Sequence, residues 1–183
     1  MTWRLLLRAL RDGPDTQPAS VLDEPTVAAL AARLDSAAQV RLGRSLAIRH
    51  VDAGSCNGCE LELQMLNSVV YDLERFGLRF VASPRHADVL TVTGPVSRNM
   101  HEALLRAWEA MPEPKWLVAI GDCAIDGGVF KGSPAILGGV EAALPVDLFI
   151  RGCPPTPAQL LNGLRALLEA NAGQPARPPR MER

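Results

Sequence analysis

The sequence predicts an α/β fold in which a mainly parallel, five-stranded sheet is covered by helices on both faces. Two observations carry this prediction. Short apolar segments with strand character alternate with segments of helical periodicity, and residues that favour turns separate them. A chain of 183 residues, 48% of them hydrophobic, is also long enough to bury one core of this kind.

Five segments are expected to form the strands, because each is short, apolar and bounded by glycine, proline or polar residues. They cover residues 45–51, 78–82, 87–93, 115–120 and 147–150. Parallel neighbours need crossover connections, and helical patterns lie between these segments. This order and the length of the chain are typical of a flavodoxin-like, doubly wound domain.

The helices are predicted from apolar residues that recur at three- and four-residue steps. They cover residues 25–42, 60–76, 97–111 and 156–170. Gly77 is expected to close the second helix, and Ser97 to cap the third. A long glycine-rich loop is expected over residues 121–139.

The chain is expected to have three parts. Residues 1–44 read as a helical N-terminal extension, residues 45–172 as the flavodoxin-like domain, and residues 173–183 as a disordered tail rich in proline and arginine. Within the extension, residues 3–10 predict a short amphipathic helix that packs on a partner, with contact to a membrane surface as the alternative.

Composition excludes several classes of function. The net charge of −1 and the aromatic content of 4% argue against nucleic acid as a partner. No apolar run approaches the roughly 18 residues of a membrane span, and the N-terminus lacks the features of an export signal. We therefore expect a cytoplasmic protein, in which cysteines more often bind metals or act in catalysis than form disulfides.

The four cysteines follow predicted strands. Cys56 and Cys59 form a C-x-x-C after the first strand, Cys123 follows the fourth strand, and Cys153 follows the last. The carboxyl ends of parallel strands meet at one edge of a sheet, so these thiols are expected to converge. Four thiolates are enough to hold one 4Fe–4S cluster, and the neighbouring glycines let the backbone come close to it.

Three other interpretations of the cysteines stay open. A structural zinc site is one alternative, although such sites usually combine two closely spaced pairs and only one pair here is tight. A thioredoxin-like thiol pair would leave Cys123 and Cys153 unexplained. Four unrelated buried cysteines would not share the glycine-rich surroundings that all four have.

The cysteine motifs resemble those of a known family. They are C-N-G-C-E-x-E at residues 56–62, G-D-C-x-x-x-G-G at 121–128 and G-C-P-P at 152–155. This set is similar to the small subunit of nickel–iron hydrogenases and to the related 20 kDa subunit of respiratory complex I, over residues 45–170. The resemblance implies a flavodoxin-like fold and one proximal 4Fe–4S cluster held by the four cysteines beside a large subunit.

Two features select a branch of this family. Complex I relatives typically have two adjacent cysteines, whereas the spacing of Cys56 and Cys59 is similar to the hydrogenase form. Conventional hydrogenases carry further clusters in a C-terminal extension, and no cysteine follows Cys153. Both features are similar to the membrane-bound, energy-converting hydrogenases, as in formate hydrogenlyase or carbon-monoxide-linked complexes.

The resemblance implies an oxidoreductase subunit with no catalytic centre of its own. It would relay electrons between a ferredoxin-like iron–sulfur subunit and the nickel–iron site of the large subunit. The complex would include membrane subunits and hold this chain peripherally on the cytoplasmic side of the membrane. The alternative is a complex I-like NADH or ferredoxin:quinone oxidoreductase, in which quinone accepts the electrons.

Several other polar residues lie near the motifs. Glu62 resembles the family glutamate that follows the cysteine pair, so it is a candidate for a proton path or for steadying the loop. Glu60 reads as an ordinary first-turn acid. Asp122 and Asp126 are expected to cap loops, with coordination of iron as the alternative.

Residues 93–95 either line the cluster or form a structural turn. Arg98 and Arg151 read as surface residues, with compensation of cluster charge as the alternative. None of the three histidines is expected to be a ligand, because they share no common spacing: His50, His86 and His101.

Overall fold

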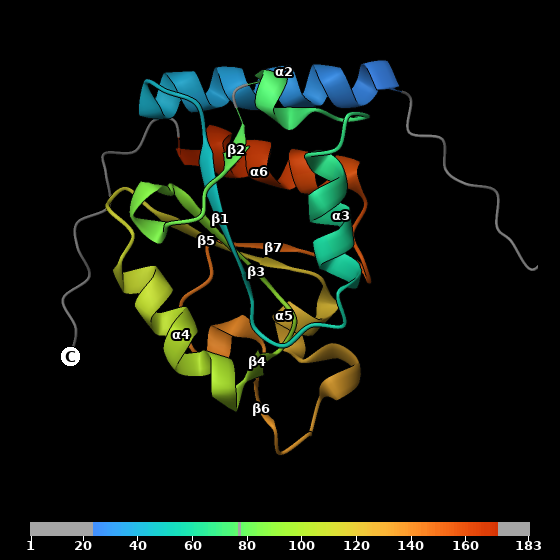
Figure 1. Ribbon diagram of the computed structural model, residues 1–183, viewed down its shortest axis with the longest axis vertical. Coiled ribbons are helices and arrows are strands. Elements are labelled where there is room, and N and C mark those ends of the chain that lie inside the picture. The colour runs from blue at the N-terminus through green and yellow to red at the C-terminus, as the bar shows by residue number, and fades with distance from the viewer. Residues whose placement is uncertain (1–23, 77, 172–183) are drawn as a thin grey trace, which may run out of the picture.

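A five-stranded sheet forms the centre of the computed structural model, which describes residues 24–76 and 78–171 (Figure 1). Its strands are β1 (Ala47–Asp52), β2 (Arg79–Phe80), β3 (Val89–Thr93), β5 (Trp116–Ile120) and β7 (Leu148–Ile150). They lie in the order β2-β1-β3-β5-β7, and every neighbouring pair is parallel. Counted along the chain, this is the order 2-1-3-4-5 of the flavodoxin-like fold, so the predicted fold class is confirmed.

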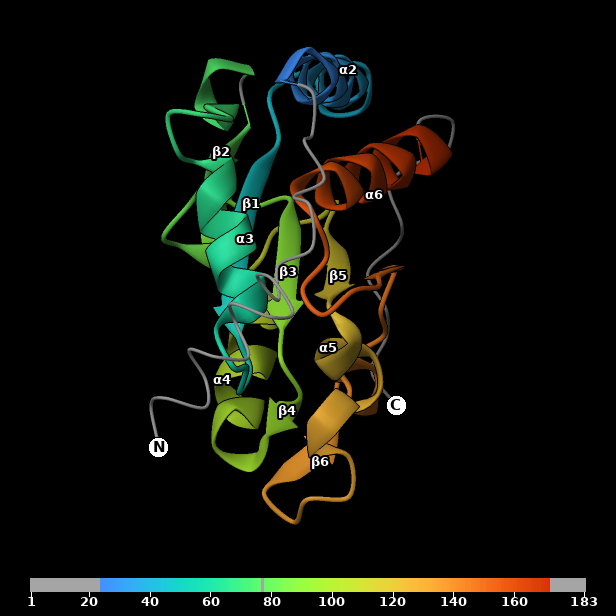
Figure 2. The same ribbon diagram turned by 90° about the vertical axis from the view of Figure 1, so that its right-hand side faces the viewer.

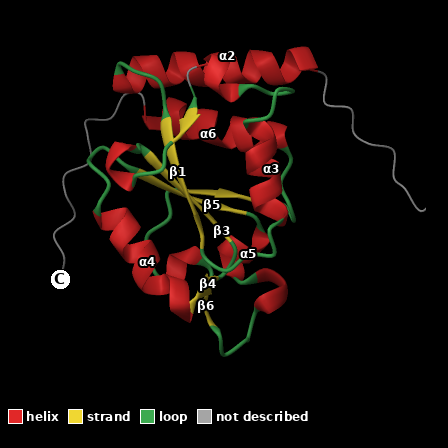
Figure 3. Cartoon of the chain, in the orientation of Figure 1, coloured by secondary structure: helices red, strands yellow, loops and turns green. Residues whose placement is uncertain are grey.

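Helices cover both faces of this sheet (Figure 3). The larger ones are α2 (Glu24–Leu42), α3 (Gly58–Leu66), α4 (Arg98–Glu109) and α6 (Pro157–Asn171). Alternate residues of β5 enter two separate cores: Val118 packs with α2, α3 and α6, whereas Leu117 packs with Leu104 of α4. The alternation follows from the two-residue period of a strand, which points successive side chains to opposite faces.

Helix α2 shares the core of the sheet domain. It lies beside α6, as Figures 1 and 2 show from two directions. Ala31, Leu34 and Ala38 of α2 are fully buried in the same cluster as the leucines of α6. The predicted helix over residues 25–42 is therefore present and packed. The predicted helix at residues 3–10, the predicted tail at 173–183 and the predicted stop at Gly77 lie outside the described residues.

The helix predicted over residues 60–76 was wrong in its second half. Helix α3 ends at Leu66, and a turn leads to the short 3₁₀ helix Leu73–Phe76. The carbonyl of Ser68 closes this turn by accepting hydrogen bonds from two amides, at 2.8 and 3.2 Å. Val70, expected on the buried face, is 54% exposed. Asparagine, serine and two β-branched valines follow Leu66, and all four residues favour helices weakly.

The segment predicted as a loop at 121–139 contains short elements. They are α5 (Asp122–Asp126), the 3₁₀ helix Gly128–Phe130 and β6 (Ile136–Gly138), followed by the 3₁₀ helix Val140–Ala142. Strand β6 pairs antiparallel with β4 (Val96–Ser97). Arg98, the first residue of α4, connects this segment to the helix, because its Nε donates to the Pro134 carbonyl at 2.7 Å. Ser97 caps α4 as predicted, with its hydroxyl accepting from the Met100 amide.

A last short 3₁₀ helix, Pro84–His86, connects β2 to β3. None of the helices in the described part of the chain combines the length and the apolar character needed to cross a membrane.

Candidate functional site

The four cysteine side chains surround one pocket at the carboxyl edge of the sheet. Cys56 and Cys59 follow β1, Cys123 follows β5 and Cys153 follows β7. We call this hollow the thiol pocket, and it is lined by Ser55, Cys56, Gly58, Cys59, Gly94, Asp122, Cys123, Gly152, Cys153 and Pro154. The fold thus brings together the cysteines that the sequence analysis placed at separate strand ends.

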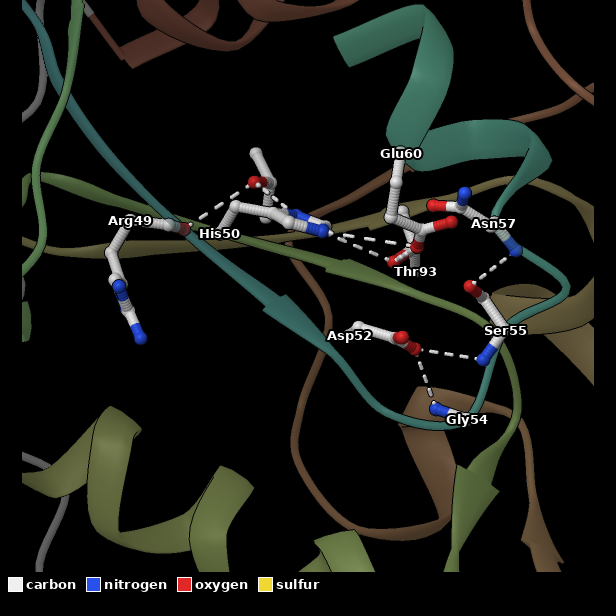
Figure 4. Close-up of polar contacts among 9 residues, drawn as sticks. Arg49, His50, Asp52, Gly54, Ser55, Asn57, Glu60 and Thr93 are labelled. Atoms are coloured by element: carbon white, nitrogen blue, oxygen red, sulfur yellow. Dashed lines mark hydrogen bonds and ion pairs between the residues drawn. The ribbon is translucent and has the colours of Figure 1, made fainter. Parts of the chain in front are cut away.

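A short turn after β1 positions the first cysteine pair (Figure 4). The Asp52 carboxylate accepts hydrogen bonds from the amides of Gly54 and Ser55, at 2.8 and 2.7 Å. The Ser55 hydroxyl then accepts from the Asn57 amide at 3.0 Å. Asn57 has a φ of 71°, a left-handed conformation that asparagine tolerates better than most residues. These local bonds start α3 at the residue before Cys59, whose thiol is buried.

The loops after β5 and β7 are tied to each other, which fixes the other two cysteines. The Asp122 amide donates to the Gly152 carbonyl at 3.0 Å, and the Gly152 amide donates back to the Asp122 carboxylate at 3.2 Å. The predicted loop-capping role of Asp122 is therefore confirmed. Because each of these residues precedes a cysteine, the pair of bonds holds Cys123 and Cys153 at the same pocket.

Two glycines make room for the sulfur atoms. A Cβ atom on Gly121 would lie 2.5 Å from the Sγ atom of Cys59, and one on Gly128 would lie 2.7 Å from the Sγ atom of Cys123. Both glycines also have positive φ angles, +88° and +49°. Any other residue at these positions would displace a thiol and strain the backbone.

Burial holds the two inner thiols in their protonated form. It raises the pKa of Cys59 to about 12, and the Glu60 carboxylate and the other three cysteines add to the rise. Burial also raises the pKa of Cys123, against a hydrogen bond from the Val129 amide that lowers it. Four thiolates this close repel one another, so a bound cationic centre would stabilise them together and displace their protons.

The residues fit a thiolate-bound metal centre on two grounds. The donors are four thiols on one pocket, and glycines at its wall leave space for sulfur. Among the described residues, no group of three or more histidine, cysteine, aspartate or glutamate side chains converges tightly enough for a single metal ion.

A buried polar network that was not predicted from the sequence lies beside the thiol pocket (Figure 4). Glu60, in the first turn of α3, is only 7% exposed. The Thr93 hydroxyl of β3 donates to the Oε1 atom of Glu60, and His50 of β1 lies 3.3 Å from that hydroxyl through Nε2. Thr91 contacts the other ring nitrogen of His50 at 3.2 Å. The signal for this network was present in the sequence, as polar residues at alternate positions of β3, a strand that the sheet buries.

The other predicted site residues divide between the pocket and the surface. Gly94, from the turn at residues 93–95, lines the thiol pocket, whereas the half-buried Glu62 is not among the residues that line it. Asp126 caps a loop as predicted, because its carboxylate accepts from the Gly128 amide at 2.9 Å. That hydrogen bond, with a contribution from Lys131, lowers the pKa of Asp126.

The remaining charged candidates do not line the thiol pocket. Arg98 anchors the segment before β6, as described above, and Arg151 is exposed. His86 lies in the 3₁₀ helix before β3 and His101 lies on α4.

The structure is a flavodoxin-like domain with four thiols at the carboxyl edge of its sheet, and comparison with known proteins identifies the family. Residues 56–167 match the family described as NADH ubiquinone oxidoreductase, 20 kDa subunit. The chain belongs to this family. The predicted family resemblance is therefore confirmed, and the family description agrees with the predicted role as a subunit of an oxidoreductase complex.

Similar proteins come from bacteria and archaea. The chain is 45% identical over 128 residues to formate hydrogenlyase subunit 7 of Escherichia coli (strain K12), which covers 70% of this chain and 50% of that protein. It is also 45% identical over 128 residues to the probable membrane-bound hydrogenase subunit mbhJ of Pyrococcus furiosus, over 70% of this chain and 77% of the relative. The chain thus spans half the length of the first relative and about three quarters of the second.

A solved structure supports the same fold. It is a chain of the membrane-bound sulfane sulfur reductase, an archaeal respiratory membrane complex. The two chains superpose with a TM-score of 0.64 at 30% sequence identity, over 78% of this chain and 77% of that one.

Proposed function

We propose that this chain is the electron-transfer subunit of a membrane-associated hydrogenase complex and carries one proximal 4Fe–4S cluster. The cluster would exchange single electrons with the nickel–iron site of a large subunit. This chain's own part is to bind the cluster, to hold it at the edge of the sheet and to exclude water from its inner side.

One observation carries the proposal: four cysteines from three separate segments, which follow β1, β5 and β7, line a single pocket. Cys56, Cys59, Cys123 and Cys153 are the ligands in this proposal, and two of them are buried. Backbone amides of the glycine-rich loops would donate hydrogen bonds to cluster sulfides, which is a recognised way to tune the potential of such centres. The similarity to two hydrogenase subunits, at 45% identity, supports the choice of partner.

The proposal extends to the partners and the location. A ferredoxin-like iron–sulfur subunit would supply or receive electrons on the other side of the cluster. Membrane subunits would anchor the complex, with this chain bound peripherally on the cytoplasmic side. Within this chain, Glu62 is the proposed proton-path residue, since it follows the cysteine pair in the family pattern and is half-buried on α3.

Replacement of one ligand tests the cluster. Cys153 is exposed, so a Cys153→Ser chain should fold and assemble. The wild-type complex, purified without oxygen and reduced, should give the electron paramagnetic resonance signal of a 4Fe–4S centre. In Cys153→Ser this signal should disappear or change shape, and the iron content should fall. An unaltered signal in the variant would remove Cys153 from the ligand set.

A complex I-like quinone reductase is the second candidate, and the family description favours it. In that case the cluster would pass electrons to quinone at the interface with the large subunit. Metal analysis of the purified complex separates the two candidates. Nickel with hydrogen evolution supports the hydrogenase, whereas quinone reduction without nickel supports the alternative. Stoichiometric zinc without iron would contradict both and indicate a structural site.

A further inference from the structure

Glu60 occupies an unusual position for an acidic residue. It directly follows Cys59 in the sequence, it is 93% buried, and its charge is felt at the Cys59 thiol. Burying a carboxylate costs several kcal/mol unless hydrogen bonds compensate, so acidic residues are rarely this buried without a reason. The Oε2 atom of Glu60 is buried and has no hydrogen-bond partner in the described part of the chain.

The Thr93 hydroxyl is the hydrogen-bond donor that holds this carboxylate. The Thr93 hydroxyl has one proton, and it donates that proton to Oε1 of Glu60. The same hydroxyl lies 3.3 Å from Nε2 of His50, where it can only accept. The Thr91 hydroxyl, which gives its proton to the Arg49 carbonyl, faces the other ring nitrogen in the same way, so a neutral His50 donates to one of the two threonines. Polar contacts therefore run from His50 through Thr93 to Glu60, from β1 across β3 to the first turn of α3, and the Thr93 hydroxyl donates to the carboxylate.

The register of β1 and β3 explains how the residues of this polar network are held in place. His50 and Thr91 are direct partners in the pairing of β1 with β3, and Thr93 lies two residues further along the same face. Thr91 and Thr93 are both fully buried. The carboxylate is thus held from two central strands, and its place beside Cys59 does not depend on a flexible loop.

We propose that Glu60 is a fixed negative charge that lowers the reduction potential of the centre in the thiol pocket, and that Thr93 and His50 are positioning residues that hold it there. The inference rests on the proposed function, because it needs a redox centre bound by the four cysteines. Reduction adds one electron to that centre, and a nearby carboxylate in surroundings of low dielectric constant raises the energy of the reduced form. Removal of the charge should therefore make reduction easier.

The first test replaces the charge and keeps the shape. Glu60→Gln retains an acceptor for the Thr93 hydroxyl and loses the negative charge. In the whole complex, a potentiometric titration followed by electron paramagnetic resonance should give a midpoint potential more positive than in the wild type, at unchanged iron content. Glu102→Gln on α4 is the matched control, because that side chain is 66% exposed and its removal should leave the potential in place. Equal midpoints in Glu60→Gln and the wild type would overturn the inference.

The second test separates positioning from general stability. Thr93→Val has nearly the same shape and removes the hydroxyl, whereas Thr93→Ser keeps the hydroxyl and removes a methyl group. We expect Thr93→Val to shift the midpoint potential or the line shape of the signal, and Thr93→Ser to restore wild-type behaviour. Thr91→Val removes an equally buried hydroxyl of β3 that does not bind Glu60, so its effect should be smaller. Matching spectra and midpoints for the valine and serine variants at position 93 would contradict a positioning role.

These outcomes are distinct from failure of the proposed function. A wild-type complex that contains no iron–sulfur signal would refute the cluster itself. A normal signal whose midpoint ignores Glu60→Gln would refute only the tuning role and leave the cluster assignment intact. Loss of iron in Thr93→Val but not in Thr93→Ser would support the positioning role of Thr93, because only the serine variant keeps the hydroxyl that binds Glu60.

Discussion

Gly121→Ala tests whether the site requires a residue without a Cβ atom next to the Cys59 thiol. Gly121 has a φ of +88°, and a Cβ atom there would lie 2.5 Å from the Sγ atom of Cys59. The strained backbone alone costs about 1–2 kcal/mol for a residue other than glycine. The sulfur must also move by about 1 Å to reach an ordinary contact distance, and overpacking of this kind adds about 1–3 kcal/mol.

Gly132 provides a matched control for this variant. Its φ of +85° is nearly the same, and nothing lies within 4 Å of a Cβ atom placed on it. Gly132→Ala should therefore share the backbone strain and lack the contact. The difference between the two variants is about 1–3 kcal/mol, or about 2–12 °C in melting temperature for a chain of this size.

Two measurements decide the outcome. Iron analysis of the purified complex should show a lower iron content in Gly121→Ala and a wild-type content in Gly132→Ala. Scanning calorimetry should show the additional loss of stability in Gly121→Ala. If both variants keep the same iron content and melt together, the contact with Cys59 does not limit the site and the reasoning fails.

Three further predictions concern other parts of the structure. In the metal-free chain at pH 8, a Cys59 thiol with a pKa of about 12 should react with iodoacetamide on the order of a thousandfold more slowly than an ordinary thiol. Peptide mass spectrometry would measure this rate, and modification of Cys59 at an ordinary rate would contradict its burial. Burial lowers the pKa of His50, so the unfolded chain takes up a proton first and the free energy of unfolding should fall as the pH drops below about 6.5. His50→Gln should flatten that dependence in denaturant titrations, and an unchanged slope would refute it. Leu34→Ala should lower the free energy of unfolding by about 2–5 kcal/mol, because Leu34 is fully buried between α2 and the rest of the core, whereas Val40→Ala at an exposed position should change it little.

The sequence predicted the sheet well because strand and helix periods differ clearly in this chain. All five segments expected as strands became strands of the main sheet, with ends shifted by at most two residues. The helix expected to reach Phe76 ends at Leu66. The prediction failed because leucines at helical spacing on both sides of a turn imitate one continuous helix. The short elements between Gly121 and Gly139 could not be predicted, since they form through tertiary contacts such as the pairing of β4 with β6.

The thiol pocket was predictable, and the network next to it was not. Cysteines at the ends of parallel strands must meet at one edge, so topology alone brings Cys56 and Cys153 together. Glu60 has the position and the charge of any first-turn acid. Its burial depends on the packing of α3 against β3, which a single sequence does not reveal. Only the alternation of threonines in β3 indicated that a polar partner was needed there.

The packing of α2 on α6 also has a consequence for how the chain is made. The two helices come from opposite ends of the described chain, yet they fill one core. At roughly 5–20 residues per second, the roughly 115 residues between them take on the order of 6–23 s to synthesise. During that interval the apolar face of α2 has no partner helix to cover it. The apolar face of α2 therefore leaves the ribosome before the helix that covers it has been made, and the core of this face closes only after synthesis has reached α6.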